Sequence, residues 1–98
     1  MIFAEIEEQA NVKDILEVLE KEFGIIEWGD QGSETNPDAY FWIYRNDVRV
    51  AVDNLTSLNF QVKCVSQDNV LVKEVITLLG NSYRVKIFDK PEFEAHEN

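Results

Sequence analysis

Tyr40-Phe-Trp-Ile-Tyr44 is the stretch that decides the fold, because it places five large residues, four of them aromatic, in a row. Aromatic and β-branched residues favour β-strands. In a strand, successive side chains point to opposite faces, so the two tyrosines and Trp42 share one face while Phe41 and Ile43 share the other. Both faces are apolar or amphipathic, which favours a central strand covered on both sides. If only one face is covered, the other is an exposed aromatic patch of the kind that marks binding sites.

The residues after this stretch alternate in the same way. Apolar and polar side chains alternate over residues 48–53 and again over residues 58–64, and short polar turns separate the segments. Three such strands in succession predict an antiparallel meander. Cys64 falls on the apolar side of the third strand, where we expect it to be a small buried residue.

The N-terminal part predicts a strand, a helix and a second strand. Alternation over residues 2–7 favours a strand, although a helix that starts early also fits the apolar positions. Asn11 is a typical N-cap, apolar residues follow at helical spacing as far as Phe23, and Gly24 is a typical helix end. Residues 25–28 predict a short strand, and the polar residues 30–38 predict an exposed loop.

The C-terminal part predicts a second helix and a last strand. Apolar residues cover more than half of the helix that ends at Gly80, which is typical of a helix that is mostly buried or that pairs with another subunit. Alternation over residues 83–88 predicts the last strand, and Pro91 is expected to stop it. We therefore predict an α+β fold with the order β-α-β-β-β-β-α-β. It is a single, mostly antiparallel sheet of five to six strands with two helices packed on one face. Residues 1–90 form one domain, and residues 91–98 form a flexible acidic tail.

Composition limits the class of protein. A chain of 98 residues with 45% hydrophobic and 29% charged residues is typical of one small globular domain. No apolar run is long enough to span a membrane, and the N-terminus lacks the features of a signal peptide. With a single cysteine, no internal disulfide can form. These features predict a cytoplasmic protein that does not bind membranes.

The net charge of −10 is unevenly distributed along the chain. Residues 1–38 carry eleven acidic residues and two lysines, a balance of −9, whereas residues 39–90 have a balance of +2. An acidic field repels phosphate backbones, so we expect no nucleic-acid binding. The same field would steer a basic partner protein toward the chain.

No motif for catalysis, a metal or a cofactor is present. The only histidine, His96, lies in the tail, where nothing would hold its geometry. Asp30, Glu34 and Asp38 do not match the spacing of an EF-hand loop, and the chain has no Gly-rich phosphate loop. The sequence therefore predicts a protein that is not an enzyme and that has no cofactor and no metal site.

The leading hypothesis is a small acidic protein-binding module, such as an inhibitor of the immunity type or a chaperone, whose partner is a basic protein. Its acidic residues would speed association, and its aromatic residues would supply the contact area. One alternative is a small-molecule sensor with a pocket between sheet and helices. Another is a structural subunit of a homo-oligomer. A chaperone of the first class would form a homodimer through the second helix or through an uncovered sheet face. The candidate partner-binding residues are Glu17, Glu20, Trp28, Asp30, Tyr40, Trp42 and Tyr44.

Overall fold

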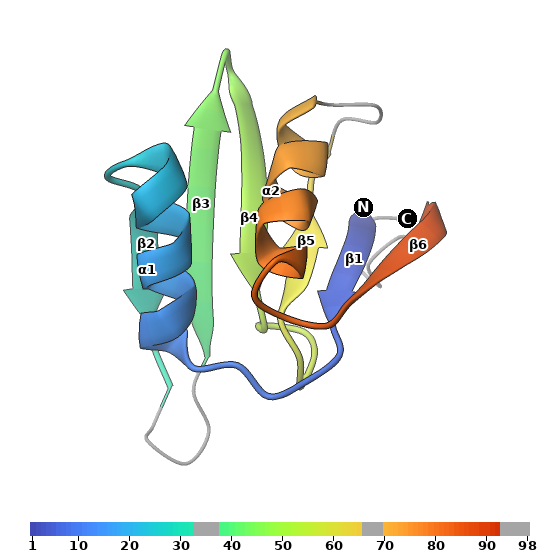
Figure 1. The fold of residues 1–98 in the computed structure, drawn as a ribbon, viewed down its shortest axis with the longest axis horizontal. Helices are drawn as coiled ribbons and strands as arrows, with labels where there is room; N and C mark the ends of the chain where they lie inside the picture. Colours follow the sequence, from blue (N-terminus) through green and yellow to red (C-terminus); the bar gives the residue numbers. More distant parts are fainter. Residues whose placement is uncertain (33–37, 66–69, 93–98) are drawn as a thin grey trace.

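The computed structural model describes residues 1–32, 38–65 and 70–92. In these ranges the chain forms one sheet and a layer of helices, in the predicted order β-α-β-β-β-β-α-β (Figure 1). The expected loop residues 33–37 and the tail residues 93–98 lie outside the described part of the chain. The elements are β1 (Ile2–Ile6), α1 (Val12–Phe23), β2 (Glu27–Asp30), β3 (Ala39–Arg45), β4 (Val48–Asp53), β5 (Gln61–Lys63), α2 (Val70–Gly80) and β6 (Val85–Glu92).

The six strands of the described residues form one sheet in the order β2-β3-β4-β5-β1-β6. Each neighbouring pair is antiparallel. Strands β2 to β5 follow one another across the sheet as the predicted meander. The first strand, β1, then lies between β5 and the last strand, β6, so both ends of the chain stabilise the same side of the sheet. This fold class is the one that the sequence predicts.

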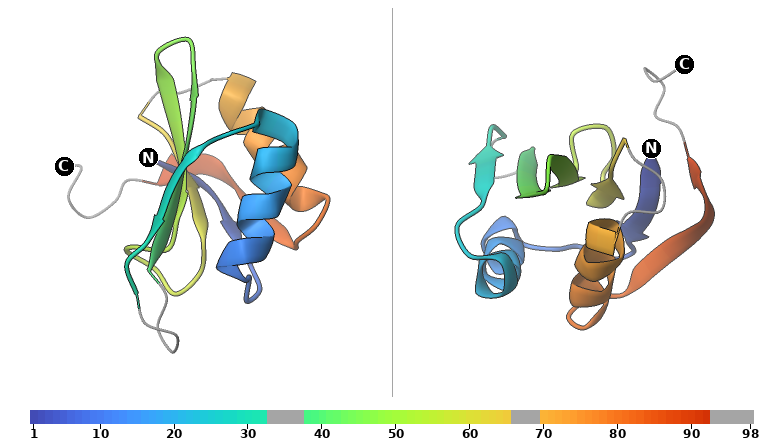
Figure 2. Two further views of the ribbon diagram at one scale, coloured as in Figure 1. Left: turned by 90° about the vertical axis from the view of Figure 1, so that its left-hand side faces the viewer. Right: turned by 90° about the horizontal axis from the view of Figure 1, so that it is seen from above.

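Both helices pack on one face of the sheet (Figure 2). Phe41 and Ile43 of β3 point into this layer and are buried, together with Val50 and Val52 of the neighbouring strand. The opposite face of β3 carries the two tyrosines and Trp42, which are partly or largely exposed. The expectation of a strand covered on both sides was therefore wrong, because the two helices supply only one covering layer.

The apolar residues of α2 are used inside the molecule. Leu71, Val72, Val75, Ile76 and Leu79 are buried in the common core. This accounts for the wide apolar surface of the helix without a second subunit. No helix in the described residues combines the length and apolarity that crossing a membrane requires.

Local signals in the sequence fix several element ends. The side chain of Asn11 accepts a hydrogen bond from the amide of Lys13 at 2.8 Å, as an N-cap does. Gly24 ends α1 with a φ of 77°, a conformation that glycine adopts without strain. Cys64 is a free, buried cysteine, as predicted.

Some strand ends differ from the prediction. The second strand begins two residues late, at Glu27, and Ile25 is 98% exposed before it. The fifth strand covers only Gln61–Lys63, so Leu58 lies in the connection and is 95% exposed. The last strand runs through Pro91 to Glu92, which is compatible with a proline because β6 is an edge strand.

Candidate functional site

A row of aromatic side chains lies on the sheet face that the helices leave uncovered. Tyr40, Trp42 and Tyr44 occupy alternate positions of β3, and we call them the aromatic row. The rings of Tyr40 and Trp42 are 4.6 Å apart between centroids. Tyr44, at the end of the row, is 55% exposed. The structure thus brings together three of the residues that the sequence singled out.

Neighbouring strands hold the aromatic row in place. The guanidinium carbon of Arg49 on β4 lies 4.6 Å from the centre of the Trp42 ring, so the indole lies between Arg49 and Tyr40. On the other side, the hydroxyl of Tyr44 donates a hydrogen bond to Glu27 Oε2 of β2 at 3.1 Å. The row therefore combines aromatic and arginine side chains in fixed positions.

The rest of the uncovered face has acidic and basic residues side by side. Across the strands, Glu5 pairs with both Gln61 and Lys86, which places these three residues on one face. Lys63 Nζ and Asp53 Oδ1 form an ion pair at 2.6 Å on the same face, and both side chains are about nine-tenths buried, because the connection between β4 and β5 covers this part of the face and its Thr56 Oγ1 accepts a hydrogen bond from Lys63 Nζ. This face is therefore not the acidic surface that the charge distribution along the chain implies.

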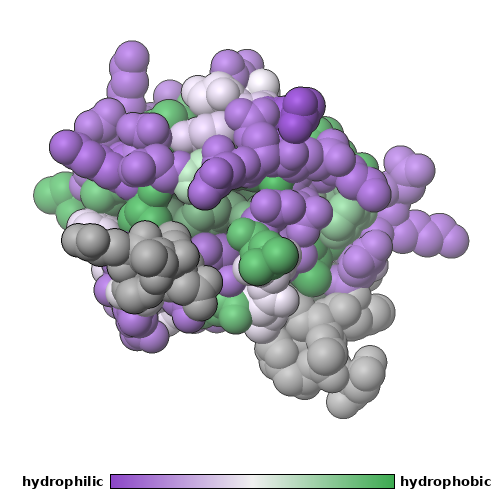
Figure 3. Space-filling model, turned by 90° about the horizontal axis from the view of Figure 1, so that it is seen from below, coloured by the Kyte–Doolittle hydropathy of each residue, from purple (hydrophilic) through white to green (hydrophobic). Residues whose placement is uncertain are grey.

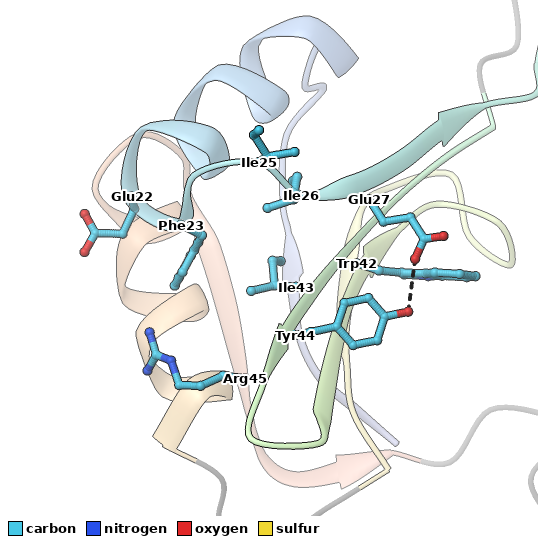
Figure 4. Close-up of a pocket in the computed structure, with 9 residues that line it drawn as sticks. All are labelled: Glu22, Phe23, Ile25, Ile26, Glu27, Trp42, Ile43, Tyr44 and Arg45. Carbon is cyan, nitrogen blue, oxygen red and sulfur yellow. Dashed lines mark hydrogen bonds between the residues drawn. The ribbon is translucent and has the colours of Figure 1, made fainter.

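A cavity of about 260 Å³ lies where the chain passes from α1 into β2 (Figure 4). Arg45 and Phe23 both line this cavity, and the guanidinium carbon of Arg45 lies 6.0 Å from the centre of the Phe23 ring. Arg45 also forms an ion pair with Glu74 of α2. The lining residues are Glu22, Phe23, Ile25, Ile26, Glu27, Trp42, Ile43, Tyr44 and Arg45.

A second cavity of about 350 Å³ lies beside α2. It is lined by Glu22 from α1 and by Val70, Lys73, Glu74, Thr77, Leu78 and Asn81. Glu22 therefore borders both cavities, and the described residues contain no cluster of His, Cys, Asp or Glu side chains that could hold a metal ion.

The other candidate residues lie apart from the aromatic row. Trp28 points to the helix side of the sheet, where its ring stacks on Phe41 at 6.3 Å between centroids, and it is 43% exposed. Asp30 shares that side, since it pairs with the buried Ala39. Glu17 and Glu20 lie on the exposed side of α1. The predicted residues therefore form two surfaces, on opposite sides of the sheet edge at β2.

The carboxylates of α1 are free of ion pairs within the described residues. The ion pairs found there join Arg45 to Glu74 and Lys63 to Asp53. Because Glu17 and Glu20 are exposed and unpaired, they contribute their full charge to the field around α1.

Sequence reasoning missed Glu27 and Arg49, which hold the aromatic row. Their positions follow from the register of β2 and β4 against β3, in which Glu27 pairs with Trp42 and Arg49 with Tyr44. The alternation over residues 48–53 contained the signal for Arg49. The signal for Glu27 was hidden, because the sequence predicted a strand that starts at residue 25.

Comparisons of this chain with protein-family models, with curated proteins and with solved structures found no match.

Proposed function

We propose that this chain is a small non-enzymatic protein-binding module and that its partner is a basic protein. One observation carries the proposal: the aromatic row lies on the helix-free face of the sheet, with Tyr40 and Trp42 partly exposed, Tyr44 largely exposed and Arg49 against Trp42. Tyrosine, tryptophan and arginine are the residues that contribute most binding energy in protein interfaces. An inhibitor of the immunity type and a chaperone are both modules of this class.

The fixed positions of these side chains favour binding. Trp42 lies between Tyr40 and Arg49, and the hydroxyl of Tyr44 is held by Glu27. A side chain that is already ordered loses less conformational entropy when a partner covers it. The aromatic row therefore offers contact area at a low entropic cost.

The acidic helix has a separate role in this proposal. Glu17 and Glu20 lie on the helix layer, so they do not reach a partner seated on the aromatic row. Their charges, with the net charge of −10, attract a basic protein during diffusion and raise its association rate. A cytoplasmic location fits a protein with a single, buried cysteine.

The two cavities give less support to a small-molecule sensor. The cavity of about 260 Å³ is smaller than the roughly 300–1,000 Å³ that is common for ligand pockets, and the cavity of about 350 Å³ lies at the low end of that range. The larger one lies beside α2 and Glu22, and its described lining includes no strand residue and no aromatic residue, unlike the pocket that a sensor would need between sheet and helices. A structural subunit is favoured no more, because α2 buries five of its seven apolar residues in the core and leaves only Val70 largely exposed.

Affinity capture from lysate of the source cells tests the proposal. The immobilised chain should retain a specific basic protein that a salt gradient releases. Trp42→Ala and Tyr44→Ala should each weaken that retention. Val70→Ala is the matched control, because it also shortens an exposed apolar side chain, 68% exposed, but on α2. If the retained protein is indifferent to both substitutions in the row, or if no basic protein is retained, the proposal is wrong.

A further inference from the structure

We infer that the free edge of β2 is the docking site for an extended, basic segment of the partner protein. The segment adds to the sheet as a new strand beside β2 and places one lysine or arginine side chain in the cavity at the end of α1. This inference rests on the proposed function, because it names the chemistry and the position through which a basic protein is held.

The hydrogen-bonding pattern shows which backbone groups β2 offers. The backbone N–H of Gln31 donates a hydrogen bond to the carbonyl of Asp38 at 2.7 Å, so the backbone groups of Gln31 point toward the β3 side. Backbone groups of successive residues in a strand alternate in direction. The N–H and C=O groups of Trp28 and Asp30 therefore point away from β3, toward the edge of the sheet, where the described residues place no further strand. An added strand would pair with these groups.

The two edges of the sheet differ in how they are protected. The edge strand β6 contains Lys86, Lys90 and Pro91, which are residues that discourage pairing with another strand. The edge strand β2, Glu27–Asp30, contains no lysine or proline. Its charged residues are both acidic, so two copies of β2 would repel each other if they paired. The same charges favour a basic strand, and this is why we assign the edge to a basic partner and not to a second copy.

The cavity beside β2 fits the stem of a long side chain. Phe23, Ile26 and Ile43 supply apolar walls in a lining that is otherwise mostly polar. Tyr44 of β3 and Glu27 of β2 lie on the sheet side of the cavity (Figure 4). The first residue of β2, Glu27, pairs with Trp42, and β3 continues past this pair to Arg45. The last residues of β3 therefore have no partner from β2. The aliphatic part of lysine or arginine packs well on such walls while its charged end stays in water.

The charges at the rim favour a cation in this cavity. Glu22 and Glu27 both line it, and neither has an ion-pair partner in the described residues. Arg45 is the cation at the rim, but it already pairs with Glu74. The C-terminal end of α1 adds the partial negative charge of a helix end. Glu22, Glu27 and the C-terminal end of α1 would all repel an acidic side chain.

A titration with two synthetic peptides tests the inference on the full chain. The first peptide has seven residues that alternate valine or threonine with arginine, and the second has glutamate in place of each arginine. Amide NMR shifts of the isotope-labelled protein are the readout. The arginine peptide should give saturable shifts at Trp28, Asp30 and Tyr44, and the glutamate peptide should not. Saturation elsewhere, equal binding of both peptides, or no saturable shift would overturn the inference.

Matched variants locate the docked segment. The titration is repeated at roughly 0.3 M salt, where charges interact over about 5 Å. The double variant Glu22→Gln/Glu27→Gln should bind the arginine peptide about three- to ten-fold more weakly than the unmodified protein. Glu17→Gln with Glu20→Gln makes the same change in net charge away from the cavity and should weaken binding less than about two-fold. Equal effects of the two double variants would argue against a local contact.

A proline at position 30 tests the strand pairing itself. Asp30→Pro removes the outward N–H, whereas Asp30→Ala removes the same carboxylate and keeps that N–H. The proline variant should lose peptide binding while its melting temperature stays close to that of Asp30→Ala. Peptide binding that survives in the proline variant, or dimers of the free chain that the proline variant abolishes, would overturn the inference.

These results are distinguishable from a failure of the proposed function. If a basic protein is captured through the aromatic row and Asp30→Pro has no effect on it, docking at β2 is wrong and the proposed function stands. If the arginine peptide binds at β2 but no basic protein is captured, docking is supported and the proposed function is not.

Discussion

The ring of Tyr40 lies directly over Gly29, its partner across the β2–β3 pair. A Cβ atom added to Gly29 would stand 2.6 Å from Tyr40 Cε1, which is too close for two carbon atoms. Glycine leaves a gap on the surface of a strand, and here an aromatic ring fills it. Because the same ring also packs on Trp42, this contact links the position of the edge strand to the aromatic row.

Gly29→Ala should therefore destabilise the fold. The new methyl group would push Tyr40 off its position, and overpacking of this kind costs about 1–3 kcal/mol. Gly80→Ala is the matched control, because a Cβ at Gly80, the last residue of α2, would meet no atom within 4 Å. It should be neutral or stabilise by up to about 1 kcal/mol. Urea unfolding measures both variants, and equal stabilities would show that Tyr40 does not constrain Gly29.

The turn between β3 and β4 predicts a stabilising substitution. Asn46 and Asp47 form a two-residue hairpin loop with φ angles of 50° and 66°. This left-handed geometry costs most residues roughly 1–2 kcal/mol and costs glycine nothing. After the greater entropy of glycine in the unfolded chain is subtracted, Asp47→Gly should stabilise by about 0.5–1 kcal/mol. Asn46→Ala should destabilise by about 1 kcal/mol, and thermal unfolding of the two variants would give opposite shifts.

Local patterns were enough to predict most of the fold. The alternation of Tyr40 to Tyr44 correctly predicted which residues share a face, although not that one of the two faces is left without a covering layer of helices, and Asn11 and Gly24 marked the ends of α1. Period and capping act over a few residues, so a sequence displays them directly. The antiparallel pairing of β2 to β5 follows from the connections between successive strands of the meander, whereas the place of β1 between β5 and β6 depends on contacts between distant parts of the chain.

The register of β2 and the layout of the candidate site could not be predicted in this way. Ile25 and Ile26 are better strand formers than Gly29, yet the strand is centred on Trp28 and Gly29. Pairing with β3 and the fit of Gly29 to Tyr40 decide this, and both are contacts between distant parts of the chain. A charge count along the sequence likewise could not show that Glu17 and Glu20 lie on the other side of the sheet from the aromatic row.

The buried ion pair between Lys63 and Asp53 should couple the two residues strongly in the free energy of unfolding. Lys63→Met would leave the carboxylate of Asp53 buried without this cation, and such a change costs about 3–5 kcal/mol. Asp53→Asn in the same chain removes the buried charge, so the double variant should be more stable than Lys63→Met alone. Urea unfolding of the two single variants and the double variant measures the coupling. If the single effects simply add, the two groups do not interact.

Tyr83 predicts a loss of stability in alkaline solution. Burial raises the pKa of the Tyr83 phenol above its ordinary value of 10.0, and the carboxylates of Asp14 and Glu8 raise this pKa further. The folded chain therefore favours the neutral phenol. Its contribution to stability is complete below pH 10 and is lost as the pH rises through the folded-state pKa. Tyr83→Phe should remove this part of the pH dependence, and Asp14→Asn should lower the pKa of Tyr83.

Phenolate absorbance during a pH titration, with urea unfolding between about pH 8 and pH 12, measures both effects. Tyr44→Phe is the control, because it removes one phenol from the opposite face of the sheet and leaves the surroundings of Tyr83 unchanged. If Tyr83→Phe and Tyr44→Phe change the alkaline unfolding curve equally, the surroundings of Tyr83 are not its cause. If Asp14→Asn leaves the pKa of Tyr83 unchanged, the carboxylate of Asp14 does not act on the phenol.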